Sequence, residues 1–220
     1  MKFYDEKKEL YFTNPRIDLI KLIPRADNNR ILEIGAGGGD TLLEIKKQNL
    51  AKEVVGIELM QMQNSNQNSP DIDKFIICDV EKTELEFPDS YFDVILLGDV
   101  IEHLLDPWAF LKKISRCLKT EGLFIASIPN IRYYPAMFKV FFKGDFGYES
   151  QGLFDKTHFR FFCKKNMRSL FTTESFKCRD IVPRDHLYEI KSKRKVFNRL
   201  TFGLFEEFLT LQYIIVAEKI

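Results

Sequence analysis

Three groups of residues in this 220-residue chain have the types and spacing of a ligand site. The first is the glycine-rich run 35–39 (GAGGG), with Glu33 just before it. Glycine lets the backbone turn sharply and approach a ligand closely. Glu33 would repel a pyrophosphate, and Asp40 stands where the dinucleotide fingerprint G-x-G-x-x-G requires its last glycine. The run therefore favours a ligand with an ammonium or sulfonium group over a dinucleotide.

The second group consists of two acidic residues at the ends of the next two predicted strands. Glu58 lies about 20 residues beyond the glycine run, where a carboxylate can accept hydrogen bonds from both hydroxyls of a ribose. Asp79 follows the third predicted strand and can accept a hydrogen bond from an adenine amino group. Together with the glycine run, these carboxylates predict a ligand that contains a nucleoside.

The third group combines imidazoles with carboxylates. Asp99, Glu102 and His103 follow the fourth predicted strand, and Asp155 and His158 lie in a later aromatic stretch. Histidine, with an ordinary pKa of about 6.5, can take a proton near neutral pH. If residues 99–103 form a helical turn, Asp99, Glu102 and His103 share one face and, with His158, can instead hold Mg²⁺, Mn²⁺ or a related ion. The residues alone leave both chemistries open.

Alternating strands and helices must position these groups. Asn14 before Pro15 predicts one helix start, Asp106 before Pro107 predicts another, and Gly122 predicts the end of that second helix. This alternation is typical of a parallel sheet with helices on both faces, which binds ligands outside the carboxyl ends of its strands. The predicted strands are 30–34, 53–58, 75–78, 92–97, 123–128, 176–182 and 212–219, and further helices are predicted at 41–48, 164–173 and 196–209.

Composition excludes several classes of protein. The chain has 33 Lys+Arg and 32 Asp+Glu, so its net charge of +1 argues against a nucleic-acid partner. A hydrophobic fraction of 45% is typical of a globular protein. Four scattered cysteines without a CxxC pair indicate reduced thiols and a cytoplasmic location. The charged N-terminus is unlike a signal peptide, and no apolar run approaches the length of about 18 residues that a transmembrane helix needs.

The order of the motifs resembles class I S-adenosylmethionine-dependent methyltransferases over nearly the whole chain. The matching segments are ILEIGAGGG, VVGIE, ICDV, FDVILLGDVIEHLLDPW, EGLFIASIPN and QYIIVAEK. The resemblance implies an α/β, Rossmann-like, seven-stranded and mostly parallel sheet with the last strand antiparallel, helices on both faces and an aromatic lid inserted after the fifth strand. It also implies a single domain, 1–220, with a cofactor-covering helix region (1–29), a cofactor-binding half (30–130), an acceptor lid (131–163) and a closing helix and strands (164–220).

The resemblance also implies a role for individual residues around S-adenosylmethionine, with S-adenosylhomocysteine as the product. Glu33 would lie near the methionine ammonium group, and Tyr11 and Arg16 would close over the cofactor and reach its carboxylate. The ribose would bind at Glu58, and the adenine would lie by Asp79. The other implied contacts are Gly35, Ala36 and Gly37 along the methionine backbone, Leu59 beside the ribose, Val80 at the adenine, and the main chain of Gly98 and Asp99.

A second resemblance concerns the acceptor. Residues 152–162 (GLFDKTHFRFF) resemble a signature of bacterial methyltransferases in cell-surface polysaccharide pathways. It implies a small acceptor, namely a sugar, a nucleotide-linked sugar or a phospho-modification group. The two histidines favour O-methylation over N-methylation. We expect His103 or His158 to be the base, with Glu102 or Asp155 orienting it.

Other interpretations remain open. A metal-dependent small-molecule O-methyltransferase would use Asp99, Glu102 and His103, although the family's common helix start without a metal is the simpler explanation. A non-catalytic S-adenosylmethionine-binding scaffold belongs to a different class. An RNA methyltransferase and an NAD-dependent dehydrogenase fit less well. The basic run 191–195 is expected to lie on a solvated surface or to contact a phosphate-bearing acceptor. Residues 196–209 are expected to pack against the sheet, against a second subunit of a homodimer, or on a membrane surface. Residues 61–69 are expected to form a polar loop or the exposed face of a helix.

Overall fold

The computed structural model describes residues 14–184 and 193–220. Tyr11 and the first two residues of the basic run lie outside these described residues, and so does the third histidine, His186. The strands are β1 (Arg30–Ile34), β2 (Glu53–Glu58), β3 (Lys74–Ile77), β4 (Phe92–Gly98), β5 (Leu118–Pro129), β6 (Phe176–Pro183) and β7 (Gln212–Lys219). The helices are α1 (Ile17–Ile20), α2 (Asp40–Lys47), η2 (Ile101–His103), α3 (Pro107–Ser115), α4 (Tyr134–Lys143), α5 (Lys164–Leu170), α6 (Lys193–Leu200) and α7 (Glu206–Leu209).

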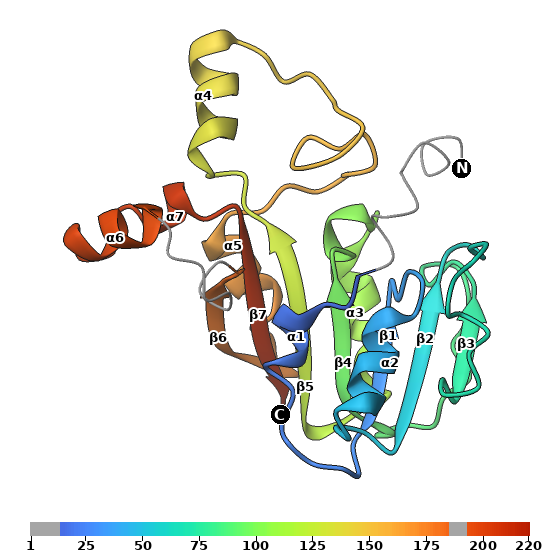
Figure 1. Cartoon of the computed structure of the whole chain (residues 1–220). Helices are drawn as coiled ribbons and strands as arrows, with labels where there is room; N and C mark the ends of the chain where they lie inside the picture. Colours follow the sequence, from blue (N-terminus) through green and yellow to red (C-terminus); the bar gives the residue numbers. More distant parts are fainter. Residues whose placement is uncertain (1–13, 185–192) are drawn as a thin grey trace.

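The seven strands form one sheet in the order β3-β2-β1-β4-β5-β7-β6 (Figure 1). Strands β1 to β5 pair in parallel, whereas β7 runs antiparallel to both of its neighbours. The chain order reverses on the two sides of β1, which creates the switch point where ligands bind in such sheets. The predicted fold, with its antiparallel last strand, is confirmed.

Helices cover both faces of the sheet, and each face has its own apolar core. On one face, α1 and α2 contribute Leu19, Leu42 and Ile45. On the other face, α3 and α5 contribute Phe110 and Met167 among others. Strand β4 is buried on both faces, because its side chains alternate between the two cores. This explains the continuous apolar run at 94–97.

Two predicted helix boundaries were wrong. Helix α1 begins at Ile17 rather than after Asn14, and its N-cap is Arg16, whose side chain makes no capping bond because it binds carboxylates instead. Helix α3 does start at Asp106, which accepts a bond from the Ala109 amide, but it ends at Ser115. Gly122 lies inside β5, where a Cβ would come within 2.8 Å of the Lys119 carbonyl oxygen.

The C-terminal segment and the insertion after β5 also differ from simple helices. The helix predicted at 196–209 is divided into α6 and α7, because the turn between them contains Gly203 at a φ of +81°. After β5, helix α4 projects from the sheet, and the chain returns through residues 144–162 (Figure 1). Within the described residues, no helix is long and apolar enough to cross a membrane.

Candidate cofactor and acceptor site

A cavity of about 860 Å³ opens at the carboxyl ends of β1, β2 and β4. Every cofactor residue that the sequence predicted within the described part of the chain lines this cavity. These residues are Arg16, Glu33, Gly35, Ala36, Gly37, Glu58, Leu59, Asp79, Val80, Gly98 and Asp99. His103, which was predicted on the acceptor side, lies on the same wall.

The glycine loop forms the part of the wall between β1 and α2. Its amides are anchored on the next strand, because Gly35 N and Ala36 N both donate to the Ile57 carbonyl oxygen, at 2.9 and 3.1 Å. Gly35 has a φ of +71°, and a Cβ there would lie 2.6 Å from Val100 Cγ2. Both the backbone conformation and the close approach therefore require glycine at this position.

A support behind the glycine loop was not predicted. Gln67, in the polar segment 61–69, is 4% exposed and donates to the carbonyl oxygens of Gly37 (2.8 Å) and Met60 (3.2 Å). Asn66 also bonds the loop, through its amide to the Gly38 carbonyl oxygen at 2.8 Å. The segment was expected only as a polar loop or a helix face, because no local pattern distinguishes a buried glutamine from its exposed neighbours.

Glu33 is a buried acid in the wall of the cavity. Its Oε2 atom has no hydrogen-bond partner among the described residues, and the residue is 2% exposed. Burial raises its pKa to about 8, although a hydrogen bond from Thr41 and the charge of Arg16 partly oppose the shift. An unpartnered buried acceptor of this kind fits a cationic ligand group such as the methionine ammonium.

Two further carboxylates line the cavity with different surroundings. Glu58 accepts bonds from the amides of Gly37 (2.8 Å) and Leu59 (2.7 Å), and burial raises its pKa. Asp79 accepts a bond from Lys82 Nζ at 2.6 Å, and this bond lowers its pKa. Hence Glu58 is held by the glycine loop itself, while Asp79 stays ionised beside a lysine.

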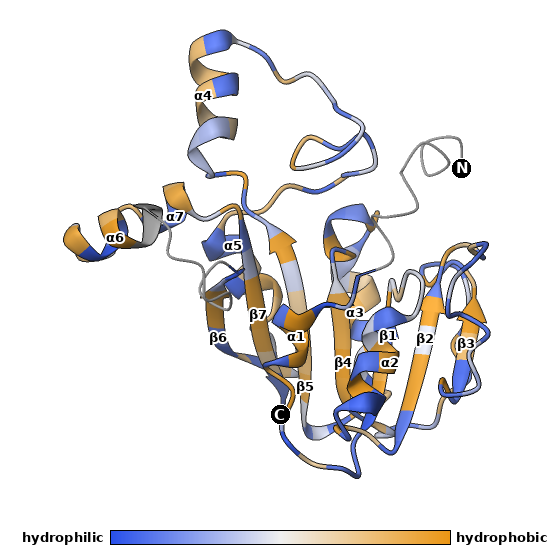
Figure 2. Ribbon diagram, in the orientation of Figure 1, coloured by the Kyte–Doolittle hydropathy of each residue, from blue (hydrophilic) through white to orange (hydrophobic). Residues whose placement is uncertain are grey.

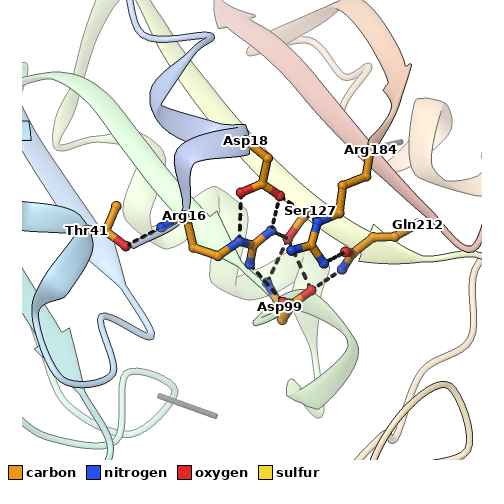
Figure 3. A network of polar contacts seen from close by, with 7 residues as sticks. All are labelled: Arg16, Asp18, Thr41, Asp99, Ser127, Arg184 and Gln212. Atoms are coloured by element: carbon orange, nitrogen blue, oxygen red, sulfur yellow. Dashed lines mark hydrogen bonds and ion pairs between the residues drawn. The ribbon is translucent and has the colours of Figure 1, made fainter. Parts of the chain in front are cut away.

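Arg16, which lines the cavity, is the centre of a polar network (Figure 3). Its guanidinium donates to both oxygens of Asp18, each at 2.9 Å, to Asp99 Oδ2 at 2.8 Å and to Ser127 Oγ at 2.9 Å. Arg184 and Gln212 complete the network: Arg184 contacts Asp18 Oδ2 at 2.7 Å and donates to Gln212, and Gln212 donates to Asp99. The network joins α1, β4, β5 and the ends of β6 and β7.

Asp18 and Asp99 are both ion-pair partners of Arg16 in this network. Burial alone would raise the pKa of Asp18, but the hydrogen bonds and charge of Arg16, with the charge of Arg184, lower it below its ordinary value. Asp99 adopts a φ of +58° and is bonded to Arg16 and Ser127. The proposed helical turn over 99–103 is therefore wrong, since only Ile101–His103 are helical and Asp99 faces the network.

The acceptor side brings together two histidines from distant parts of the chain. The rings of His103 and His158 have centroids 4.7 Å apart and meet edge to face. His103 Nδ1 is 2.9 Å from the Thr157 carbonyl oxygen, and His158 Nδ1 is 3.0 Å from that of Leu153. A carbonyl can only accept, so in both neutral rings the proton is on Nδ1 and Nε2 is the basic nitrogen.

Glu102 and Asp155 hold this part of the site in place. The Glu102 carbonyl oxygen accepts from the amides of Phe159 (2.9 Å) and Arg160 (3.1 Å), which fastens the returning lid to η2. Asp155 Oδ1 accepts from the amide (2.9 Å) and hydroxyl (2.7 Å) of Thr157. Asp155 therefore fixes the residue whose carbonyl group orients His103.

Three of these side chains can also be considered as metal ligands. Atoms of Glu102, His103 and His158 that can ligate a metal lie within 4.8 Å of one another. Two imidazoles and one carboxylate form a set that suits several divalent transition metals. Asp99, which the sequence placed in this set, is not part of it, because its carboxylate faces Arg16.

The chain has detectable relatives in both sequence and structure. It is 27% identical over 109 residues to a 27-O-demethylrifamycin SV methyltransferase of Amycolatopsis mediterranei, covering 47% of this chain and 40% of that one. It is 31% identical over 103 residues to a ubiquinone biosynthesis O-methyltransferase of Bradyrhizobium diazoefficiens, covering 46% and 40%. The chain thus spans less than half the length of these curated relatives.

Solved structures share the fold over nearly the whole chain. A putative S-adenosylmethionine-dependent methyltransferase from Listeria monocytogenes superimposes with a TM-score of 0.65 at 17% identity, over 92% of this chain and 95% of that one. A putative methyltransferase of Haloferax volcanii, in complex with the Trm112 methyltransferase activator, gives 0.63 at 15% identity, over 96% and 91%. A family model described as "Methyltransferase domain" matches residues 9–179. The chain belongs to this family of S-adenosylmethionine-dependent methyltransferases.

Proposed function

We propose that this chain transfers a methyl group from S-adenosylmethionine to a hydroxyl group of a small acceptor in surface-polysaccharide biosynthesis. The observation that carries the proposal is the position of His103. It lies on the wall of the cofactor cavity and in ring contact with His158 from the segment 152–162. A base at this place joins the cofactor side to the part of the sequence that resembles polysaccharide-modifying enzymes.

The cofactor residues can bind S-adenosylmethionine with complementary charge. Glu33 would hold the ammonium group, Glu58 the ribose hydroxyls and Asp79 the adenine amino group. Arg16 already donates to Asp18, Asp99 and Ser127, so we propose that it sets the shape of the methionine subsite as well as contacting the cofactor carboxylate. When bound, S-adenosylmethionine supplies an electrophilic methyl group on a positively charged sulfur.

His103 is the residue to which we assign the proton transfer. Its Nδ1–H donates to the Thr157 carbonyl oxygen, so Nε2 is the ring nitrogen that would accept the proton of the acceptor hydroxyl. His158 does not line the cavity but packs against His103, so we assign it a positioning role together with Asp155. Glu102, buried next to both imidazoles, would stabilise the positive charge that forms on His103.

The domain organisation, the oligomeric state and the cellular location are part of the same proposal. We propose one domain over 1–220, with residues 1–29 covering the cofactor, 30–130 binding it, 131–163 covering the acceptor and 164–220 closing the sheet. The acceptor is small or nucleotide-linked, the chain acts as a monomer or homodimer, and the location is cytoplasmic. These proposals rest on the balanced charge, the unpaired cysteines and the resemblance of 152–162.

Calorimetric titration provides the direct test. We expect micromolar binding of S-adenosylmethionine and S-adenosylhomocysteine and no binding of NAD, followed by methyl transfer from labelled cofactor to a member of a nucleotide-sugar panel. A folded sample that binds neither sulfur compound would contradict the enzyme proposal and favour a scaffold. Cofactor binding with transfer to other small hydroxyl compounds, but to no sugar, would retain the methyltransferase and reject the polysaccharide acceptor.

A metal-dependent O-methyltransferase is the second candidate, and the proximity of Glu102, His103 and His158 favours it. In that case the ion would lower the pKa of the acceptor hydroxyl, and the imidazoles would be ligands instead of bases. The two candidates differ in one measurement. Loss of transfer after treatment with a chelator, with recovery on adding Mg²⁺ or Mn²⁺, supports the metal, and full activity in the chelator supports His103 as base.

A further inference from the structure

Two protruding elements beside the acceptor side expose large apolar side chains. One is the segment 196–205, which comprises the second half of α6 and the turn before α7. Phe202 is 95% exposed and Leu204 is 79% exposed, on either side of Gly203. Apolar side chains that stand in water at the tip of a turn indicate a surface that something else covers.

Helix α6 adds a basic amphipathic character to this segment. Val196, Phe197 and Leu200 fall on one face of the helix, and all three are exposed. The sequence 191–205 contains five Lys or Arg residues and no Asp or Glu. In a chain whose net charge is only +1, this is a strong local concentration of positive charge.

Helix α4 also combines exposed aromatic side chains with lysines. Phe138 and Phe142 stack with ring centroids 5.2 Å apart, and Phe141 and Phe142 are 70% and 79% exposed. The helix sequence contains Lys139 and Lys143 and no acidic residue, and Lys139 forms ion pairs with Glu149 and Asp145 of the returning chain. Figure 2 shows that apolar residues recur along α4 and α6, which lie at the edge of the molecule instead of in its core.

Contacts at the base of the two elements hold them together. Arg132, just before α4, forms an ion pair with Glu207 of α7, and its guanidinium lies 4.6 Å from the centre of the Phe208 ring. Asn130 Nδ2 donates to the carbonyl oxygens of Glu207 (2.7 Å) and Thr210 (2.8 Å). Both elements leave the sheet near the end of β5 (Figure 1), so one extended surface can meet both.

The chemistry of the two elements favours a lipid surface over a protein surface. The core of a protein–protein interface is depleted in lysine, whereas aromatic rings with flanking Lys and Arg are typical of helices that lie in the interface of a membrane. Anionic headgroups would match the positive charge of 193–205, which has four Lys or Arg residues and no Asp or Glu. We propose that α4 and the segment 196–205 dock the chain on an anionic phospholipid bilayer.

Vesicle co-sedimentation tests this proposal without any methyl transfer, so its outcome is independent of the proposed function. We expect the chain to sediment with vesicles of phosphatidylcholine and phosphatidylglycerol, much less with phosphatidylcholine alone, and less as salt rises. Phe202→Ser with Leu204→Ser should weaken binding roughly tenfold or more, since two large apolar side chains would no longer enter the lipid. Lys143→Gln with Arg199→Gln should reduce the preference for anionic vesicles.

A matched control removes apolar surface elsewhere. Ile77 and Ile220 are 43% and 60% exposed on other parts of the molecule, so Ile77→Ser with Ile220→Ser should leave vesicle binding unchanged. Circular dichroism confirms that each variant is folded. Absence of vesicle binding by the folded wild-type chain at low salt would overturn the proposal. A dimer in light scattering that the Phe202/Leu204 variant converts to a monomer, without vesicle binding, would assign the surface to a second copy of this chain instead.

Discussion

The cofactor side and the acceptor side of this molecule are built in different ways. The cofactor side consists of strand ends and short loops, and its groups are fixed by the pairing of β1 with β2 and β4. The acceptor side depends on a long excursion after β5 that returns to η2 through hydrogen bonds to single carbonyl groups, such as that of Glu102. The cofactor side is therefore formed by the sheet itself, whereas the acceptor side is formed by a segment inserted after β5.

This difference implies that the affinity for the cofactor and the rate of methyl transfer can be changed independently of each other. A change on the cofactor side should alter cofactor binding, because Glu33, Gly35 and Glu58 line the cavity that we propose for the cofactor. A change in the returning lid should alter the transfer of the proton, because His158 and Thr157 act through His103. Variants on each side can therefore test whether cofactor affinity and the rate of methyl transfer depend on different residues.

The largest effect is expected for His103→Ala. Loss of a general base typically slows a reaction by about 10²–10⁴-fold, and we expect a decrease of kcat in that range. Cofactor affinity, measured by calorimetry, should stay close to that of the wild type because the cofactor groups are unchanged. His158→Ala should give a smaller loss of kcat and a shifted pH profile, as expected of a positioning residue. A fall in cofactor affinity as large as the fall in kcat would mean that the two sides are not separable.

The next largest effect is expected for Gly35→Ala. The added Cβ would lie 2.6 Å from Val100 Cγ2 at a φ of +71°, so the loop must move. We expect a loss of stability of about 1–3 kcal/mol and at least a roughly tenfold loss of cofactor affinity. Thermal unfolding and calorimetry measure the two quantities.

Gly152→Ala is the matched control on the acceptor side. Gly152 also has a positive φ, +84°, but among the described residues a Cβ there would meet nothing within 4 Å. We therefore expect only the backbone cost of about 1–2 kcal/mol and no change in cofactor affinity. Equal losses of affinity in the two variants would show that the close contact with Val100 is not what matters at Gly35.

The sequence was sufficient to predict which residues line the cavity at the ends of the strands. Except for Arg16 at the start of α1, the predicted residues that line the cavity lie at or just after the ends of strands. Because the carboxyl ends of parallel strands meet at one edge of the sheet, Glu33, Glu58 and Asp79 had to converge. The antiparallel β7 came from the family resemblance instead, because its apolar sequence is compatible with either direction.

The acceptor side could be predicted only in part. His103 and His158 were expected near the same site, but their contact depends on where 131–163 returns to the sheet, which no periodicity determines. The separation of Asp99 from Glu102 and His103 was missed because its positive φ arises from long-range bonds to Arg16 and Ser127. Buried Gln67 was missed for the same reason, since its partners lie on the glycine loop.

A smaller effect, which depends on pH, is expected at Glu33. Its pKa of about 8 means that the carboxyl is largely protonated at neutral pH in the free chain, and that a bound ammonium group would favour ionisation. Cofactor binding at pH 7 should therefore release a proton, which calorimetry in buffers of different ionisation enthalpy detects. Glu33→Gln should abolish that release and weaken binding, most strongly above pH 8. A proton count that is the same in wild type and variant would contradict the assignment.

The same shift predicts how the stability of the free chain varies with pH. The folded chain holds the Glu33 proton more tightly than the unfolded chain, because its pKa rises from 4.5 to about 8 on folding. The contribution of the protonated Glu33 to the free energy of unfolding is fully present below pH 4.5 and is lost as pH rises to about 8. Denaturant unfolding should therefore show the wild type losing stability relative to Glu33→Gln between these values. Parallel stability curves for the two proteins would show that Glu33 does not titrate in this range.

The smallest effect is expected behind the glycine loop. Gln67→Ala removes three hydrogen bonds and leaves the carbonyl groups of Gly37 and Met60 and the amide of Met62 without this partner, so we expect a loss of about 1–2 kcal/mol in the free energy of unfolding. Cofactor affinity should fall only a few-fold, since the loop keeps its bonds to Ile57. Asn68→Ala, one residue further along and exposed, is the control and should change stability by less than about 0.5 kcal/mol. If the two variants were equally stable, the polar segment 61–69 would be a simple surface loop, and the cofactor side would depend on the sheet alone.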